Sequence, residues 1–184
     1  MAAAAARLQT VSEHSARGES ADFRVVVRVR PALADEHAAA GSHDSLVCDG
    51  TMVTARHDDG LGPSPAYSFT FDAAFSPADG QDEVYDRAAR PAVGSILAGF
   101  NASIIAYGHT GAGKTFTMDG ALEPPEARGI IPRAIHGIFS HIAQEALAAP
   151  SKRFLVRAGY LQVSTDHTRT HTHTHQEDVA RMVS

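Results

Sequence analysis

The sequence predicts an α/β domain in which strands alternate with helices around one glycine-rich loop. The first observation is a short apolar run at residues 102–107 that leads directly into the glycines of residues 108–113. The second is that a helix is expected to begin at about Lys114, which gives the order strand, loop, helix. The third is a pair of β-prone segments upstream of the loop, at residues 23–30 and residues 67–71.

The first strand is expected at residues 23–30. This segment, FRVVVRVR, is almost continuously β-branched before it turns polar, which is typical of a buried strand whose end reaches a surface. Pro31 ends the strand, because proline has no backbone N–H to donate. Two short β-prone pieces, residues 45–48 and residues 52–54, are separated by an Asp-Gly pair and predict a hairpin.

A third strand and a helix follow. Residues 67–71, YSFTF, alternate aromatic with small polar side chains, as expected of a strand. A helix is expected to start near Ser76, with a kink at Pro91 and a stop at Gly99. Residues 102–107, ASIIAY, are expected to form the strand that enters the glycine loop.

After the loop, an amphipathic helix is expected at about residues 132–149, because proline is favoured in the first turn and apolar residues then recur at helical spacing. Residues 154–163, FLVRAGYLQV, predict the last strand. The composition then changes to an alternation of His and Thr. We therefore divide the chain into a flexible Ala-rich extension at residues 1–22, a domain at residues 23–163 and a low-complexity tail at residues 164–184.

The composition excludes several classes of protein. With 184 residues, of which 43% are hydrophobic, the chain is long enough for one domain with a core. The formal net charge of -5 gives no overall basic field, so no nucleic-acid partner is expected. No apolar run reaches the length needed to cross a bilayer, so no membrane partner is expected. The single cysteine, Cys48, cannot form an internal disulfide and fits a reducing, cytoplasmic setting.

Residues 108–115 match the phosphate-loop pattern G-x-x-x-x-G-K-S/T at every defined position, between a predicted strand and a predicted helix. A chance match in a chain of this length is an event of about one per cent, which disfavours the alternative of a simple glycine-rich turn. The match predicts a nucleotide-binding loop formed by Gly108, His109, Thr110, Gly111, Ala112, Gly113, Lys114 and Thr115.

The chemistry of phosphate binding explains these residue types. Glycines let the backbone curl so that its N–H groups point at phosphate oxygens, and the start of the following helix also favours an anion. Lys114 is expected to pair with the β and γ phosphates, and Thr115 to supply its hydroxyl to Mg²⁺. ATP and Mg²⁺ are therefore the expected ligands.

Short segments on both sides of the loop resemble the kinesin motor domain and occur in the kinesin order. They are VRVRP at residues 27–31, YSFTFD at residues 67–72, GFNA at residues 99–102, AYG at residues 106–108, FTM at residues 116–118 and GIIPRA at residues 129–134. The resemblance covers residues 23–163. It implies a P-loop NTPase-type α/β fold with a central mixed sheet flanked by helices, present here as the incomplete first half of a kinesin motor fold. Residues 121–128 would be the variable loop of the family.

The resemblance also assigns residues to the nucleotide site. Arg28, Arg30 and Pro31 would form the platform for adenine, and Phe116 occupies the family's other position that faces adenine. A guanidinium plane and a proline ring both offer flat faces for stacking, which agrees with this role. The alternative for the two arginines is a solvated strand end. His109 stands where the family usually has glutamine.

The resemblance implies an ATP-driven microtubule motor of the cytoplasm and cytoskeleton, with tubulin as its partner. No segment after Val163 resembles the family's switch sequences, NxxSSRSH and DLAGSE, so no catalytic residue is assigned and little hydrolysis is expected of this chain alone. The main microtubule-binding helices also belong to the family's second half. Two further interpretations stay open: a module that holds nucleotide without turnover, and an inert truncated product of a misjoined gene model, which the His/Thr repeat favours.

An alternative to a low-complexity tail is that its histidines form a metal site, because imidazole binds Zn²⁺, Cu²⁺ and Ni²⁺. They are His167, His171, His173 and His175. No second group of ligands is evident in the sequence, so we expect adventitious chelation at most. We also expect a marginal or aggregation-prone chain, since the strands that flank residues 102–107 in the family come from its second half.

Overall fold

The computed structural model describes residues 23–33, 46–56, 65–159 and 177–178. The chain divides into two compact units, residues 1–138 and residues 139–184. The predicted extension at residues 1–22 and nearly all of the predicted tail, including its histidines, lie outside the described residues.

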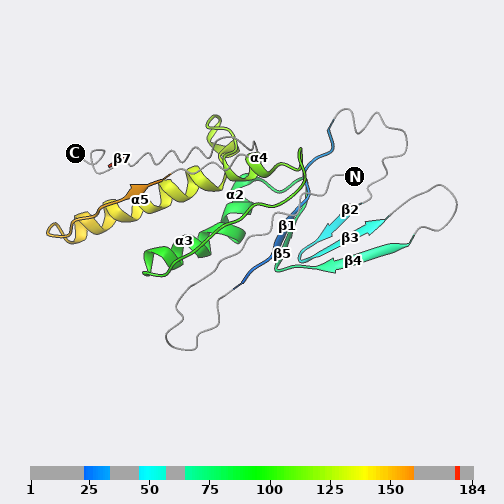
Figure 1. Ribbon diagram of the computed structural model, residues 1–184, viewed down its shortest axis with the longest axis horizontal. Helices are drawn as coiled ribbons and strands as arrows, with labels where there is room; N and C mark the ends of the chain where they lie inside the picture. The colour runs from blue at the N-terminus through cyan, green and yellow to red at the C-terminus, as the bar shows by residue number, and fades with distance from the viewer. Residues whose placement is uncertain (1–22, 34–45, 57–64, 160–176, 179–184) are drawn as a thin grey trace, which may run out of the picture. The chain divides into compact units, whose positions relative to one another are not determined.

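Two short parallel strands lie next to each other in the first unit (Figure 1). Strand β1, Val26–Arg28, pairs in parallel with β5, Ala73–Phe75, and all residues of both strands are buried. The β-branched segment that predicts a buried strand therefore forms one, although the paired part is shorter than residues 23–30. Parallel strands covered on both faces are expected to be continuously apolar, as these nearly are.

A second sheet is antiparallel and has the order β2-β3-β4. Strands β2, Leu46–Asp49, and β3, Met52–Arg56, form the predicted hairpin, and its turn contains Gly50 at φ 59°. A positive φ costs glycine no steric strain, which explains the Asp-Gly pair. Strand β4, Ala66–Thr70, confirms the strand predicted from the aromatic alternation.

A helical segment follows the second sheet. It consists of α2, Gln81–Val84, a π-helical turn η1, Tyr85–Ala89, and α3, Arg90–Leu97. The sequence predicts a kink at Pro91, and the structure has the π-helical turn directly before that proline, where the regular helical hydrogen-bond pattern changes. Gly99, at φ 95°, ends the helix as predicted, and its N–H donates to the carbonyl of Ile96 at 2.9 Å.

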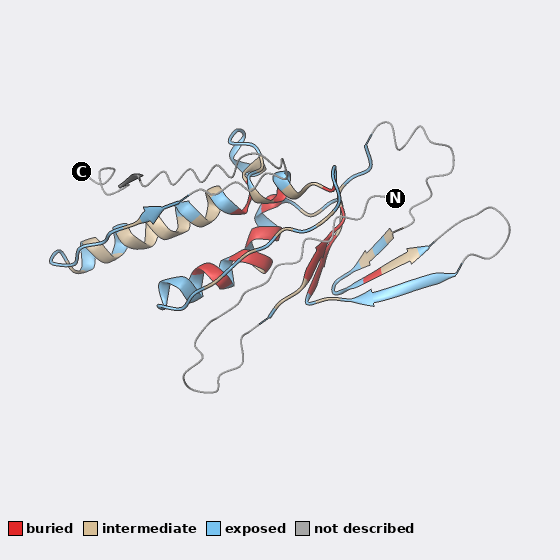
Figure 2. Cartoon of the chain, viewed as in Figure 1, coloured by how far each residue is buried: buried red, intermediate tan, exposed pale blue. Residues whose placement is uncertain are grey.

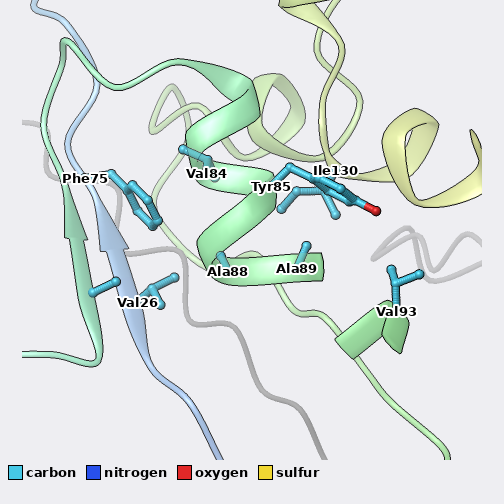
Figure 3. Packing of buried hydrophobic residues seen from close by; sticks show 9 residues of the cluster. Val26, Phe75, Val84, Tyr85, Ala88, Ala89, Val93 and Ile130 are labelled. Carbon is cyan, nitrogen blue, oxygen red and sulfur yellow. The ribbon is translucent and has the colours of Figure 1, made fainter. Parts of the chain in front are cut away.

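The core of the first unit joins the parallel strands to this helical segment (Figure 3). The ring of Phe75, which is completely buried, and Val26 face the helical residues Val84 and Ala88. Ile130 at the start of the long helix belongs to the same cluster. Figure 2 shows these buried residues in red on β1, β5 and the helical segment. The core thus fixes the positions of the elements that lead to the glycine loop.

Residues 102–107 differ from the prediction, because they have no strand partner among the described residues. Their exposure still alternates along the chain, as in a strand: Ile104 packs against the core, whereas Ile105 is 46% exposed and Tyr107 is 70% exposed. A strand is defined by a ladder of backbone hydrogen bonds, and an apolar sequence alone cannot supply the second member of that ladder. The prediction of a strand is therefore wrong for the described residues, whereas the lack of a described partner agrees with the expectation that the flanking strands of the family come from its second half.

The segments after the loop are shorter or shifted relative to the predictions. Helix α4, Lys114–Met118, begins where expected, and after a 3-10 turn η2, Pro125–Ala127, helix α5, Ile130–Ala148, begins slightly before Pro132. This earlier start is compatible with the proline, because the first N–H groups of a helix have no partner within it. The break between α4 and α5 agrees with the predicted variable loop.

The second unit contains one described strand pair. Strand β6, Arg157–Ala158, pairs antiparallel with β7, Glu177–Asp178. Of the predicted strand at residues 154–163, the structure pairs Arg157 and Ala158, and residues 160–163 lie outside the described part. The two sheet types and the helices together make an α/β fold, and none of its described helices is long and apolar enough to span a bilayer.

Candidate nucleotide site

The predicted phosphate loop has the backbone that its glycines allow. Gly111 lies at φ 81° and Gly113 at φ 89°, values that side chains with a Cβ atom rarely adopt. Ala112 between them is buried, and its N–H donates to the carbonyl of His109 at 3.1 Å. The loop is therefore a tight curl that leads directly into α4, the arrangement expected of a phosphate cradle.

Lys114 reaches back across this curl. Its Nζ atom donates hydrogen bonds to the carbonyl oxygens of Gly108 at 2.7 Å and His109 at 2.9 Å. The ammonium group is thus held at the opening residues of the loop, within reach of an anion that the loop amides would bind. A lysine with two carbonyl acceptors can exchange them for phosphate oxygens, which are stronger partners because they are charged.

Thr115 and His109 lie on the exposed side of the loop. Among the described residues, no group of three or more His, Cys, Asp or Glu side chains could hold a metal ion. The hydroxyl of Thr115 is one oxygen ligand of the kind that Mg²⁺ takes, together with phosphate and water oxygens, and the carboxylate that usually accompanies them is not identified among the described residues. The Nδ1 atom of His109 lies 2.6 Å from the carbonyl oxygen of Thr110, a contact that depends on the ring tautomer.

Arg28, at the end of β1, is buried and donates two hydrogen bonds to side chains. Its Nη1 atom donates to Oε1 of Gln81 at 2.9 Å and to Oγ1 of Thr117 at 3.1 Å, and only 9% of the residue is exposed. Burial lowers the pKa of its guanidinium, and the charge of Asp79 partly opposes this shift. The alternative of a solvated strand end therefore does not describe Arg28.

Phe116 lies above this arginine. The guanidinium carbon of Arg28 is 5.3 Å from the centroid of the Phe116 ring, within the range of a cation–π contact, and the phenylalanine is 51% exposed. The structure therefore brings Arg28 and Phe116 together as the family resemblance implies, but with the arginine beneath the ring.

Arg30 and Pro31 follow β1, and Arg30 contacts the phosphate loop. The Nε atom of Arg30 donates to the carbonyl of Gly111 at 2.9 Å, and its Nη1 atom to the carbonyl of Pro31 at 2.8 Å. The segment after β1 is thus tied to the phosphate loop by a side chain that is distant in sequence.

Sequence reasoning missed two residues of this site. Gln81 and Thr117 are buried polar residues that bond Arg28, and neither is assigned a role in the site by the sequence. Thr117 is part of the FTM segment, but its partner lies 89 positions away. No local pattern predicts such contacts, because they depend on how β1, α2 and α4 pack.

The loop between α4 and α5 is closed by backbone contacts to Arg133. Its Nε atom donates to the carbonyl of Arg128 at 2.8 Å, and its Nη2 atom to that of Glu126 at 3.0 Å. Gly120 also forms an isolated antiparallel bridge with Arg128. The variable loop is thereby held at its base, next to the end of α4.

Comparison with known proteins decides the family. The sequence model of the kinesin motor-domain family matches residues 28–178. The chain belongs to the kinesin motor-domain family. The match extends past Val163, where the short motifs stop, and includes the two residues of β7, Glu177–Asp178. The motif-based limit at Val163 therefore omits the last part of the kinesin match.

Individual kinesins agree with this assignment. The Kinesin-like protein KIF3C of Bos taurus is 41% identical over 150 residues, 80% of this chain and 18% of the relative. Kinesin-like protein klp-20 of Caenorhabditis elegans is 42% identical over 146 residues, 79% of this chain and 22% of the relative. The chain thus spans about a fifth of the length of these kinesins.

A solved kinesin structure supports the fold. It is described as a fast kinesin, with implications for its ATPase mechanism and its interactions with microtubules. Its TM-score to this chain is 0.58 at 32% sequence identity, over 72% of this chain and 34% of the kinesin. The α/β arrangement of strands, glycine loop and helices is therefore that of a partial kinesin motor domain.

Proposed function

We propose that this chain binds ATP with Mg²⁺ through residues 108–115. The observation that carries the proposal is the position of the Lys114 ammonium, which is held by the carbonyls of Gly108 and His109 at the mouth of a loop curled by two glycines with positive φ. Thr110, Gly111, Ala112 and Gly113 would supply backbone N–H groups to the phosphates. The hydroxyl of Thr115 would bind Mg²⁺, which supplies charge neutralisation when bound.

The base would lie against Phe116, with Arg30 and Pro31 as the other members of the adenine platform. The exposed surface of Phe116 supports this placement, as does the hydrogen bond that joins Arg30 to the loop at Gly111. Arg28 would act from beneath the ring, because its guanidinium is buried against Gln81 and Thr117. On this proposal Arg28 has a supporting role beneath the ring.

A binding titration tests this proposal. A fluorescent ATP analogue with Mg²⁺ is titrated into the chain and into the Lys114→Ala variant. We expect the variant to bind about 10- to 100-fold more weakly, the loss expected for charge-assisted hydrogen bonds to phosphate. Lys152→Ala is the matched control, since this exposed lysine pairs with Glu145 in the second unit and should change affinity by less than about twofold. Equal affinity of the chain and Lys114→Ala would contradict the proposal.

A second candidate function is ATP hydrolysis coupled to microtubules, favoured by membership of the kinesin family. On this proposal the whole protein would be cytoplasmic, associated with the cytoskeleton, and would have tubulin as its partner. Phosphate release by this chain, measured with and without microtubules, separates the candidates. A module that holds nucleotide without turnover would bind ATP and release phosphate at the same slow rate in both cases. Release accelerated by microtubules would support motor activity, and an inert chain would bind no nucleotide.

A further inference from the structure

Gln81 is a buried polar residue at the first position of α2, and it bonds three separate segments. Its Oε1 atom accepts from Nη1 of Arg28 at 2.9 Å. Its Nε2 atom donates to the carbonyl of Phe116 at 2.7 Å and to the carbonyl of Ala127 at 3.3 Å. Only 4% of the residue is exposed. A side chain buried at this level with its amide engaged at both ends holds its neighbours in place.

The direction of the Gln81 amide follows from its partners. Arg28 has only donors, so the atom facing it must be the amide oxygen. The carbonyls of Phe116 and Ala127 have only acceptors, so the atom facing them must be the NH₂ group. Both halves of the amide are therefore needed, and neither a carboxylate nor an alkyl side chain can make the same set of bonds.

These bonds converge on the ring of Phe116. The Gln81 amide fixes the main chain of Phe116 through its carbonyl, and it also orients the Arg28 guanidinium that lies 5.3 Å from the ring centroid. Thr117 holds the same Arg28 nitrogen at 3.1 Å. The phenylalanine is thus positioned from its backbone and from one face, while about half of it stays exposed.

We propose that Gln81 is a positioning residue of the nucleotide site, which holds Phe116 and Arg28 so that the exposed ring receives the purine base. The inference rests on the proposed binding of ATP at residues 108–115 and adds a residue that does not itself touch the nucleotide. An ordered aromatic surface binds a base more tightly than a mobile one, because less conformational entropy is lost on stacking. Gln81 therefore contributes to binding of the base, whereas Lys114 and the loop amides bind the phosphates.

The comparison of two ligands separates these roles. Calorimetric titrations of the full chain use Mg-ATP, which has a base, and Mg-tripolyphosphate, which has only the phosphates. Gln81→Ala should weaken binding of ATP by about tenfold, which corresponds to the loss of much of one stacking contact. Binding of tripolyphosphate should change by less than about twofold, since the loop keeps its own contacts. A merely structural role would weaken both ligands equally.

Two further variants keep the test decisive. Gln81→Glu keeps an acceptor for Arg28 but cannot donate to the carbonyls of Phe116 and Ala127, so it should also lower the ratio of ATP to tripolyphosphate affinity. Glu83→Gln is the control, because this residue lies on the same helix and pairs with Arg87 at an exposed site. Its affinity ratio should match that of the unmodified chain.

The outcomes distinguish this inference from the proposed function. An unmodified chain that binds neither ligand overturns both. An unmodified chain that binds both ligands, with an unchanged affinity ratio in Gln81→Ala and Gln81→Glu, overturns the role of Gln81 alone. An equal loss for both ligands in these variants also overturns it. If Gln81→Ala does not fold, Gln81→Glu carries the same test.

Discussion

At the scale of single residues, the phosphate loop depends on backbone angles that only glycine adopts without strain. Gly113, at φ 89°, ends the curl and directly precedes Lys114. The space around it is open, since a Cβ atom added there would meet nothing within 4 Å. The requirement for glycine is therefore conformational, and it can be separated from any effect of packing.

We predict that Gly113→Ala lowers the free energy of unfolding by about 1–2 kcal/mol, the cost of placing a residue with a Cβ atom in the left-handed region. It should also weaken nucleotide binding, because relief of the strain would move the loop amides. Denaturant unfolding and nucleotide titration check both effects. The control is Gly94→Ala, at an exposed helical position with nothing within 4 Å of its Cβ, which should stabilise the chain by about 0.5–1 kcal/mol. If both substitutions changed the free energy of unfolding in the same direction, the positive φ of Gly113 would not be the reason for its requirement.

A second prediction concerns Cys48, whose Sγ atom lies 3.7 Å from the carbonyl oxygen of Phe75. Burial raises the pKa of this thiol, and the charge of Asp79 raises it further. The folded chain therefore holds the proton more tightly than the unfolded chain. This contribution to stability is present below the unfolded pKa and is lost as the pH rises through the folded pKa.

Alkylation of Cys48 should accordingly be slower in the folded chain than in the chain unfolded by denaturant, at about pH 8 where thiols begin to ionise. The rate is followed by mass spectrometry with iodoacetamide, and the ratio of the two rates should shrink as the pH is raised. Equal rates in the folded and unfolded chains would show that the thiol is not shielded.

At the scale of elements, the sequence predicts those turns and helix ends whose conformation depends on residues close together in the chain. The hairpin of β2 and β3 follows from an Asp-Gly pair between β-prone pieces, and the end of α3 follows from Gly99, because both depend on backbone angles within a few residues. The phosphate loop is predictable for the same reason. The conformation of residues 102–107 is not predictable in this way, since the pairing of a strand depends on a partner that is distant in the sequence.

The candidate site is also predictable from the sequence only where its residues are close together in the chain. Its loop is defined by eight consecutive residues, 108–115, but the support of Phe116 comes from Gln81 and Arg28, which lie 35 and more positions upstream. A glutamine that bonds a carbonyl at that distance leaves no periodic or compositional trace. Only the packing of α2 between β1 and α4 identifies it.

The variable loop between α4 and α5 gives a prediction at this scale. Arg133→Ala removes the donor that bonds the carbonyls of Arg128 and Glu126, so the loop should open more often. A glutamate-specific protease should then cut after Glu126 several-fold faster. Arg153→Ala, which changes an exposed arginine in the second unit, serves as control and should leave the rate unchanged. Equal cleavage of both variants would mean that Arg133 does not hold the loop.

At the scale of the whole molecule, the described sheets are small. Among the described residues, the parallel sheet has two strands and the two antiparallel sheets have three and two strands, while the apolar residues Ile105 and Tyr107 are exposed on a segment without a described strand partner. Apolar side chains that stay exposed add little burial of apolar surface to the stability of a fold. The expectation of a marginal chain therefore has a structural basis in the described residues.

We predict a broad thermal transition of low enthalpy for the 184-residue chain, below the roughly 0.7 kcal/mol per residue typical of globular domains. Mg-ATP should shift the transition upward, because a ligand that binds only the folded state stabilises it by mass action. Scanning calorimetry with and without Mg-ATP measures both. A sharp transition with the full enthalpy would show that the fold is cooperative as it stands.

Amide hydrogen exchange tests the phosphate loop most directly, since the proposal is that backbone N–H groups of residues 108–115 hold the phosphates. Addition of Mg-ATP should slow exchange across this loop and at the start of α4, Lys114–Met118, and should not do so in Lys114→Ala. Binding of ATP that leaves exchange in the loop unchanged, or that protects a different part of the chain, would contradict the assignment of the nucleotide site.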